Sequence, residues 1–154
     1  MNLGITKEFK VIALREMPLP SEMLQCETPD HVVEYWNRAI RESPQFNPEC
    51  ECFAVLFLTT RRKVRGHILV SIGTMDTILV DPRSVFRAAI IASASAIVLA
   101  HNHPSGEASP SDADIKVTRD LIRAGQLLKI EVIDHVIIGK GQRVSLRELG
   151  YFSV

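Results

Sequence analysis

A short apolar run that ends in a pair of histidines constrains the fold of this chain more than any other feature. Residues Ala96 to Ala100 are uniformly apolar, and His101-Asn102-His103-Pro104 follows directly. An unbroken apolar run of this length predicts a strand buried on both faces of a sheet. Proline then ends strand pairing, because it has no backbone N–H to donate. Strand side chains alternate, so both histidine rings are expected on one side of this strand end.

Helical and strand-like segments alternate along the rest of the chain. Two helices are predicted to begin at Thr28-Pro29 and Asp81-Pro82, where a capping residue precedes a proline, and a third at Ser109-Pro110-Ser111. This alternation predicts an α/β protein. The expected helices cover about 29–42, 82–93 and 111–128, the last with Ile115, Leu121, Ile122 and Leu128 facing inward. The expected strands cover 9–14, 51–60, 64–72, 96–100 and 130–138, the second and third joined as a hairpin by Arg61-Arg62-Lys63.

Length and charge limit the domain count and the partners. A chain of 154 residues with 46% hydrophobic content is enough for one compact domain, here residues 49–154, on which a segment of residues 1–48 packs as a short strand plus a helix. Eighteen Lys and Arg balance eighteen Asp and Glu, so the net charge gives no support to a nucleic-acid partner. No apolar run is long enough to span a membrane, and the first ten residues lack the apolar core of a signal peptide. The odd number of cysteines, with Cys50 and Cys52 too close for an ordinary disulfide, favours a reducing compartment. We expect a soluble cytoplasmic protein.

Three residues around the histidine pair carry ligand atoms suited to a metal ion. His101 and His103 share one side of a strand end, and Asp114 falls in the first turn of the next predicted helix, within reach of the same point. Two imidazoles and one carboxylate leave a fourth position open, which is typical of catalytic zinc sites. The same ligands also accept other divalent ions. The alternative, in which Ser111 only caps the helix and Asp114 is an ordinary first-turn carboxylate, does not account for the two histidines.

A candidate base lies upstream. Glu51 opens an apolar run that continues to Leu58, where partial burial would raise the proton affinity of a carboxylate and suit a general base. The residue pattern alone leaves equally open that Glu51 is the solvated first residue of a strand.

The combined spacing resembles the JAMM motif of MPN-type metalloproteases. Glu51 lies upstream, and His101-x-His103 is followed by seven residues, Ser111, two residues and Asp114. The longer pattern resembles the RadC-like branch of that superfamily over about residues 51–152. It consists of His101-Asn-His-Pro-Ser-Gly106, Pro110-Ser111-x-x-Asp114, Asp134-His135 and Val144-Ser145. The resemblance implies a three-layer α/β/α sandwich of the JAB/MPN type, related in layout to cytidine deaminases, with a mixed central sheet.

The resemblance also implies a role for each matching residue. His101, His103 and Asp114 match the zinc ligands, and Glu51 matches the acidic residue that orients and deprotonates the water on the metal. Ser111 matches the residue that helps to hold the tetrahedral intermediate. The implied activity is zinc-dependent hydrolysis of a peptide or isopeptide bond in a substrate that the sequence does not name.

Two other functions compete with this interpretation. Zinc nucleoside deaminases share the layout, but their His-x-Glu and Pro-Cys-x-x-Cys signature is missing here. A metal-stabilised scaffold or a DNA-repair-associated accessory module stays open. The basic turn with Arg65 would suit contact with phosphates, although it is equally typical of a solvated hairpin tip. Full-length RadC proteins carry a helix-hairpin-helix module before this domain, and residues 1–48 show no matching pattern, which disfavours a role in DNA repair.

Five further residues receive no catalytic assignment. Asp81 stands where relatives often have histidine. Asp134-His135 is expected to be a structural hydrogen-bonding pair. His31 and His67 are isolated, and each is expected on the surface or bonded to local partners.

Overall fold

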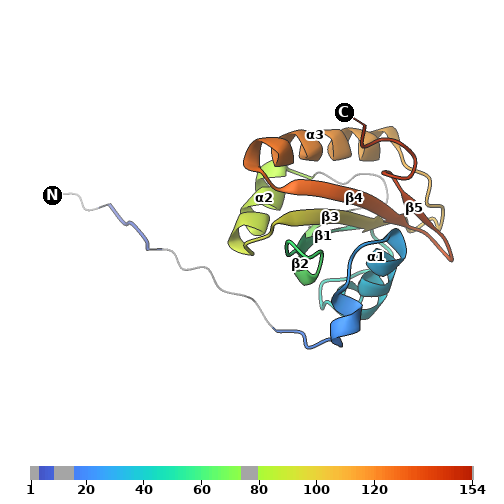
Figure 1. Cartoon of the computed structure of the whole chain (residues 1–154), viewed down its shortest axis with the longest axis horizontal. Helices are drawn as coiled ribbons and strands as arrows, with labels where there is room; N and C mark the ends of the chain where they lie inside the picture. Colours follow the sequence, from blue (N-terminus) through green and yellow to red (C-terminus); the bar gives the residue numbers. More distant parts are fainter. Residues whose placement is uncertain (1–3, 9–15, 74–79, 154) are drawn as a thin grey trace.

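A three-layer α/β/α sandwich forms the body of the protein. The computed structural model describes residues 4–8, 16–73 and 80–153, so the strand predicted at 9–14 lies outside the described residues. Among those residues, five strands form one sheet in the order β2-β1-β3-β4-β5. Helix α1 covers one face, and α2 and α3 cover the other (Figure 1). The predicted fold class is confirmed.

The sheet is mixed. β1 pairs antiparallel with both β2 and β3, whereas β3 and β4 are parallel and are connected through α3. β1 and β3 are buried at every position, as the apolar runs predicted for central strands. The strands are β1 (Cys52–Leu58), β2 (Val64–Ile72), β3 (Ala96–Asn102), β4 (Glu131–Ile138) and β5 (Arg143–Ser145).

Each main helix begins at the capping residue that the sequence indicated. The side chains of Thr28, Asp81 and Ser111 each accept a hydrogen bond from a backbone N–H in the first helical turn. Asp81 is therefore a helix cap. The helices are α1 (Pro29–Tyr35), α2 (Pro82–Ile91) and α3 (Asp112–Leu128), with a 3-10 turn at Ser21–Leu24 and a π-helical turn at Trp36–Ile40 after α1.

Two apolar clusters fill the spaces on either side of the sheet. Ala54 and Leu56 of β1 pack with α1, while Phe53 and Val55 of the same strand pack with α2 and α3. This alternation follows from the two-residue period of a strand. The expectation that Leu128 faces inward is wrong, because 44% of it is exposed. The helix ends at its cap residue Lys129, which has a positive φ of 60°, and the chain then folds back over Gly125, where an added Cβ would lie 2.4 Å from the carbonyl oxygen of Ile130.

Candidate metal centre

Three elements meet where β3 ends. His101 is the penultimate residue of β3, which runs two residues further than predicted, and His103 follows the strand. Because β1 runs antiparallel to β3 and pairs Phe53 with His101, the start of β1 lies beside the end of β3. Glu51 directly precedes β1 and so lies at the same edge of the sheet. Asp114 comes from the first turn of α3.

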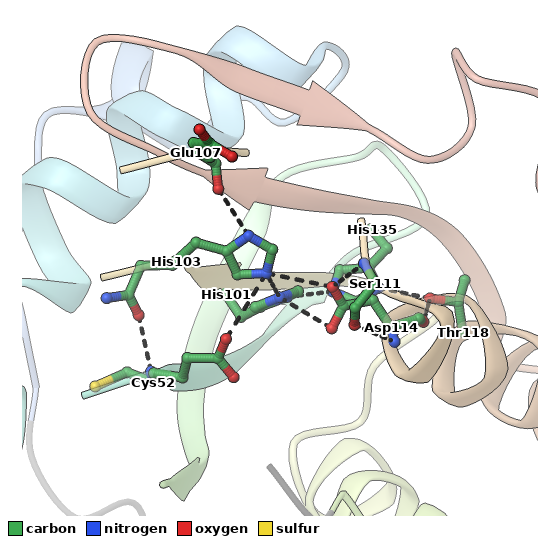
Figure 2. Close-up of polar contacts among 10 residues, drawn as sticks. Cys52, His101, His103, Glu107, Ser111, Asp114, Thr118 and His135 are labelled. Carbon is green, nitrogen blue, oxygen red and sulfur yellow. Dashed lines mark hydrogen bonds and ion pairs between the residues drawn. The ribbon is translucent and has the colours of Figure 1, made fainter. Parts of the chain in front are cut away.

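Three side chains converge on one point. The Nε2 atoms of His101 and His103 lie 3.0 Å apart. Asp114 lies beside both rings, with Oδ1 3.3 Å from Nε2 of His101 and Oδ2 3.2 Å from Nε2 of His103 (Figure 2). Adjacent ligand atoms of a tetrahedral zinc site with bonds of about 2.0–2.1 Å are about 3.3 Å apart. The donor types and their spacing therefore fit a zinc ion held by these three residues.

A hydrogen bond of Nδ1 determines which ring nitrogen of His103 carries the proton. Nδ1 of His103 lies 2.8 Å from the backbone carbonyl oxygen of Glu107 (Figure 2). Because a carbonyl oxygen only accepts, Nδ1 carries the proton and donates it. A neutral His103 thus presents the lone pair of Nε2 to the site, as a metal ligand requires.

A second, buried chain of hydrogen bonds fixes the proton on His101. Thr118 donates its hydroxyl proton to the backbone carbonyl oxygen of Asp114 at 2.7 Å, so its oxygen must accept from Nδ1 of His135, 2.6 Å away. Nε2 of His135 then accepts from Nδ1 of His101 at 2.7 Å. All three side chains are fully buried. These hydrogen bonds place the proton of His101 on Nδ1, so Nε2 faces the site with its lone pair free.

The charge state of His135 suits this role. Burial, together with the nearby His101, holds the pKa of His135 well below its ordinary value. His135 is therefore neutral and has one donor and one acceptor nitrogen. The predicted Asp134-His135 pair is confirmed only for the backbone of His135, whose N–H donates to the Asp134 carboxylate. Asp134 also accepts the hydroxyl of Ser145, and the His135 ring bonds to His101 instead.

The Asp114 carboxylate and His103 shift each other's pKa in opposite directions. Burial by itself would raise the pKa of Asp114, but its contacts with the His101 and His103 rings and with the backbone N–H of Ser111 outweigh burial and lower that pKa well below the ordinary value. The hydrogen bond to Asp114 raises the pKa of His103 above its ordinary value, against the opposing effect of burial. Asp114 is thus a carboxylate, and a cation entering the site replaces a proton shared with His103.

Glu51 lies beside the histidines. Its Oε1 is 3.8 Å from Nε2 of His103, and its side chain is only 17% exposed. Ligand atoms of Glu51, His101 and His103 all lie within 4.8 Å of one another. The sequence left open a solvated Glu51, and the structure instead places it, partly buried, at the edge of the candidate metal site.

Ser111 holds Asp114 in place. Its Oγ accepts from the backbone N–H of Asp114 at 3.1 Å, and its backbone N–H donates to Oδ2 of Asp114 at 2.8 Å, which forms a capping box. The helix-cap alternative for Ser111 therefore holds, and the same capping box orients the Asp114 carboxylate toward the histidines. Ser111 itself is exposed next to the site.

The sequence did not predict two residues of this centre, Thr118 and His135. Thr118 lies four residues after Asp114, which is one helical turn and the same helix face, so its spacing was the available signal. For His135, the sequence predicts only a pair with Asp134. Its contact with His101 depends on the pairing of β3 with β4, which residue patterns do not reveal.

The two isolated histidines and the basic turn named in the sequence analysis lie outside this cluster. His67 bonds to the hydroxyls of Tyr35 and Ser43, as expected for a satisfied histidine, and His31 accepts the backbone N–H of Glu27. Arg62 of the basic turn pairs with Glu131 at 3.1 Å.

All three cysteines are free. None of the helices in the described residues has the length and apolar character needed to cross a membrane.

Comparison with known proteins places the chain in a family. A model of the RadC-like JAB domain matches residues 26–151. A UPF0758 protein of Caldanaerobacter subterraneus subsp. tengcongensis is 39% identical across 98% of this chain and 65% of its own length. UPF0758 proteins of Marinomonas sp. strain MWYL1 and Thermosynechococcus vestitus are 40% and 46% identical, across 97% and 64% of this chain.

This chain spans only part of those proteins. It aligns with 65%, 67% and 40% of the lengths of the three relatives, and their shared name states no activity. The family model nevertheless covers most of the chain, including the whole candidate metal centre. The chain belongs to the RadC-like JAB-domain family.

Proposed function

We propose that this protein is a zinc-dependent metallopeptidase or isopeptidase. One observation carries the proposal. The Nε2 atoms of His101 and His103 lie 3.0 Å apart, and the Asp114 carboxylate lies against both, with Oδ1 3.3 Å from the first and Oδ2 3.2 Å from the second. The Glu51 carboxylate lies next to the same two rings. Three protein ligands that leave a fourth position open are typical of catalytic rather than structural zinc.

Zinc bound here would lower the pKa of a coordinated water to about 7 and polarise the carbonyl of a substrate amide. His101, His103 and Asp114 would hold the ion. Glu51 would accept a proton at a carboxylate oxygen and return it to the nitrogen of the leaving amine. Its position 3.8 Å from Nε2 of His103 supports this role, because a base must lie within reach of the reacting group.

Ser111 would stabilise the negative charge that develops on the substrate carbonyl oxygen. Ser111 is an exposed residue next to the site, and its helix directs the positive end of its dipole toward the same region. The substrate class is a peptide or isopeptide, and its sequence preference depends on surfaces that the site itself does not define.

The test combines metal content with cleavage. Zinc should be present at one ion per chain in the purified wild type and lost in His103→Ala, measured by elemental analysis. Wild type should cleave members of a library of peptides and isopeptides, and Glu51→Gln should retain zinc but lower turnover by at least about 10²-fold. Zinc lost in His103→Ala without any cleavage by the wild type would contradict hydrolysis and favour a metal-stabilised scaffold.

A further inference from the structure

A single side chain connects the two ligand histidines to the candidate base. Asn102 lies between His101 and His103, and its side-chain amide bonds to the backbone on both sides of Glu51. Oδ1 accepts from the N–H of Cys52 at 2.8 Å, and Nδ2 donates to the carbonyl oxygen of Cys50 at 3.1 Å. Only 9% of Asn102 is exposed, so water is largely excluded from these bonds.

These two bonds continue the sheet where its ladder stops. The last pair between β1 and β3 joins Phe53 to His101. Beyond it, the amide of Asn102 supplies one acceptor and one donor, the same groups that a backbone peptide would supply. Among side chains, only Asn and Gln offer both groups in one neutral amide, and Gln is longer by one methylene.

The backbone of Glu51 is also held from the opposite edge. Its carbonyl oxygen accepts from the N–H of Gly73, just beyond β2, at 2.9 Å. The peptide groups around Glu51 are therefore bonded on both sides. Because Asn102 is covalently flanked by both histidines, these bonds tie the backbone of Glu51 to the backbone that carries the two rings.

We propose that Asn102 is a positioning residue that sets the place of the Glu51 carboxylate relative to the metal ligands. It touches neither the metal nor a substrate and acts through the backbone of residues 50–52. This inference rests on the proposed function in one respect: Glu51 must act on a group bound at the metal. Asn102→Ala should therefore impair what Glu51 does while leaving zinc binding by His101, His103 and Asp114 intact.

The first measurement needs neither metal nor substrate. Hydrogen exchange of the Cys52 amide should accelerate at least tenfold in Asn102→Ala, because that amide loses its acceptor. Ser145→Ala is the matched control: Ser145 is also a buried polar residue, and it bonds to Asp134 and to the backbone of Glu148, away from Glu51. It should leave Cys52 exchange unchanged. An unchanged rate in Asn102→Ala would overturn the proposal.

The second measurement separates positioning from general stability. Asn102→Ala should keep the zinc dissociation constant within threefold of wild type and lower kcat by about 10²-fold, which a misplacement of about 1 Å can cause. In a Glu51→Gln background it should change kcat no further, since both substitutions remove the same function. Ser145→Ala should lower kcat by the same factor in both backgrounds, or not at all. An equal loss of kcat from Asn102→Ala in both backgrounds would contradict positioning.

The third measurement keeps the inference testable if no substrate is cleaved. In the cobalt-substituted protein, the pH midpoint of the change in the visible spectrum should move equally in Asn102→Ala and Glu51→Gln, and no further in the double variant. Absent cleavage with this coupling would refute the hydrolase and retain the positioning role. Independent shifts would refute the positioning role alone. If Asn102→Ala does not fold, Asn102→Ser, which cannot reach both backbone groups, should show the same changes at smaller size.

Discussion

At the scale of single residues, the hydrogen bonds from His101 to His135 and on to Thr118 determine which nitrogen of His101 can bind a metal. Thr118 has one proton and gives it to the backbone of α3, which fixes the donor and acceptor nitrogens of His135 and, through them, those of His101. Partners of this kind orient metal ligands and contribute to metal affinity. The sequence predicted the ligand types, but this chain depends on strand and helix pairing that no local pattern encodes.

Thr118→Val tests this chain of hydrogen bonds. Valine has nearly the same shape but no hydroxyl, so Nδ1 of His135 loses its acceptor and His101 loses its fixed tautomer. We expect zinc affinity to fall by about 10–100-fold, measured by competition with a chelator. Long-range ¹H–¹⁵N NMR spectra should show mixed tautomers of His101.

The control for this prediction is Thr59→Val. Thr59 accepts two backbone N–H groups within the β1–β2 turn, at the other end of the strand from the metal site. It should leave zinc affinity and the His101 spectrum unchanged. The same result in Thr118→Val would show that the tautomer of His101 does not depend on Thr118.

The dependence of zinc binding on pH follows from His103 and Asp114. The pKa of His103 is raised, mainly by its hydrogen bond to Asp114, so protons compete with zinc already above the ordinary histidine value of about 6.5. Zinc affinity, measured by calorimetry across about pH 5.5–8.5, should fall as the pH is lowered through that raised pKa. In the metal-free protein, the same proton stabilises the fold fully below about pH 6.5, and this contribution is lost as the pH rises through the raised pKa.

Asp114→Asn removes the largest cause of the raised pKa, so the onset of proton competition should move to lower pH. Asp120→Asn is a suitable control, because Asp120 lies on the same helix but bonds to Lys116. Its pH profile should match that of the wild type. Identical onsets in Asp114→Asn and wild type would rule out Asp114 as the cause.

At the scale of secondary-structure elements, the sequence predicted correctly those features that depend on neighbouring residues. The starts of α1, α2 and α3 were predicted because each depends on a capping side chain one to three residues away. β5 was not predicted, because three residues are too few to show a strand pattern. The sequence predicts one continuous helix through the π-helical turn at Trp36–Ile40, since the apolar spacing of this turn is similar to that of an α-helix.

Ser111→Ala tests whether the cap of α3 also serves the site. Loss of the cap should lower the free energy of unfolding by about 1 kcal/mol, measured by chemical denaturation. Turnover should fall by a larger factor than zinc content, because the hydroxyl is proposed to act on the substrate oxygen. Equal losses of turnover and zinc would indicate that Ser111 only holds Asp114.

The matched control is Thr28→Ala, which removes the equivalent cap of α1 far along the chain from the metal ligands. It should cost a similar amount of stability and leave the ratio of turnover to zinc content unchanged. A comparable change in that ratio would assign the effect of Ser111→Ala to stability alone.

At the scale of the whole molecule, the site is a consequence of sheet order. β1 and β3 are neighbours and antiparallel, which brings Glu51 to His101 across 50 residues, and the crossover through α3 brings Asp114 to the same end of β3. The pattern around the histidines predicted Asp114 from local spacing. Glu51 was assigned only through the resemblance to JAMM proteases, because pairing between distant strands leaves no local signal. The division between residues 1–48 and 49–154 stays a prediction.

Zinc K-edge X-ray absorption of the purified wild-type protein reports on the ligands of the proposed metal centre themselves. We expect one zinc per chain bound only by nitrogen and oxygen at about 2.0–2.2 Å, with the scattering pattern of two imidazoles. Sulfur ligands at about 2.3 Å would instead place the metal on the cysteines, of which Cys50 and Cys52 flank Glu51. Either that result or the absence of bound metal from a folded, zinc-supplemented protein would contradict the metal centre proposed here.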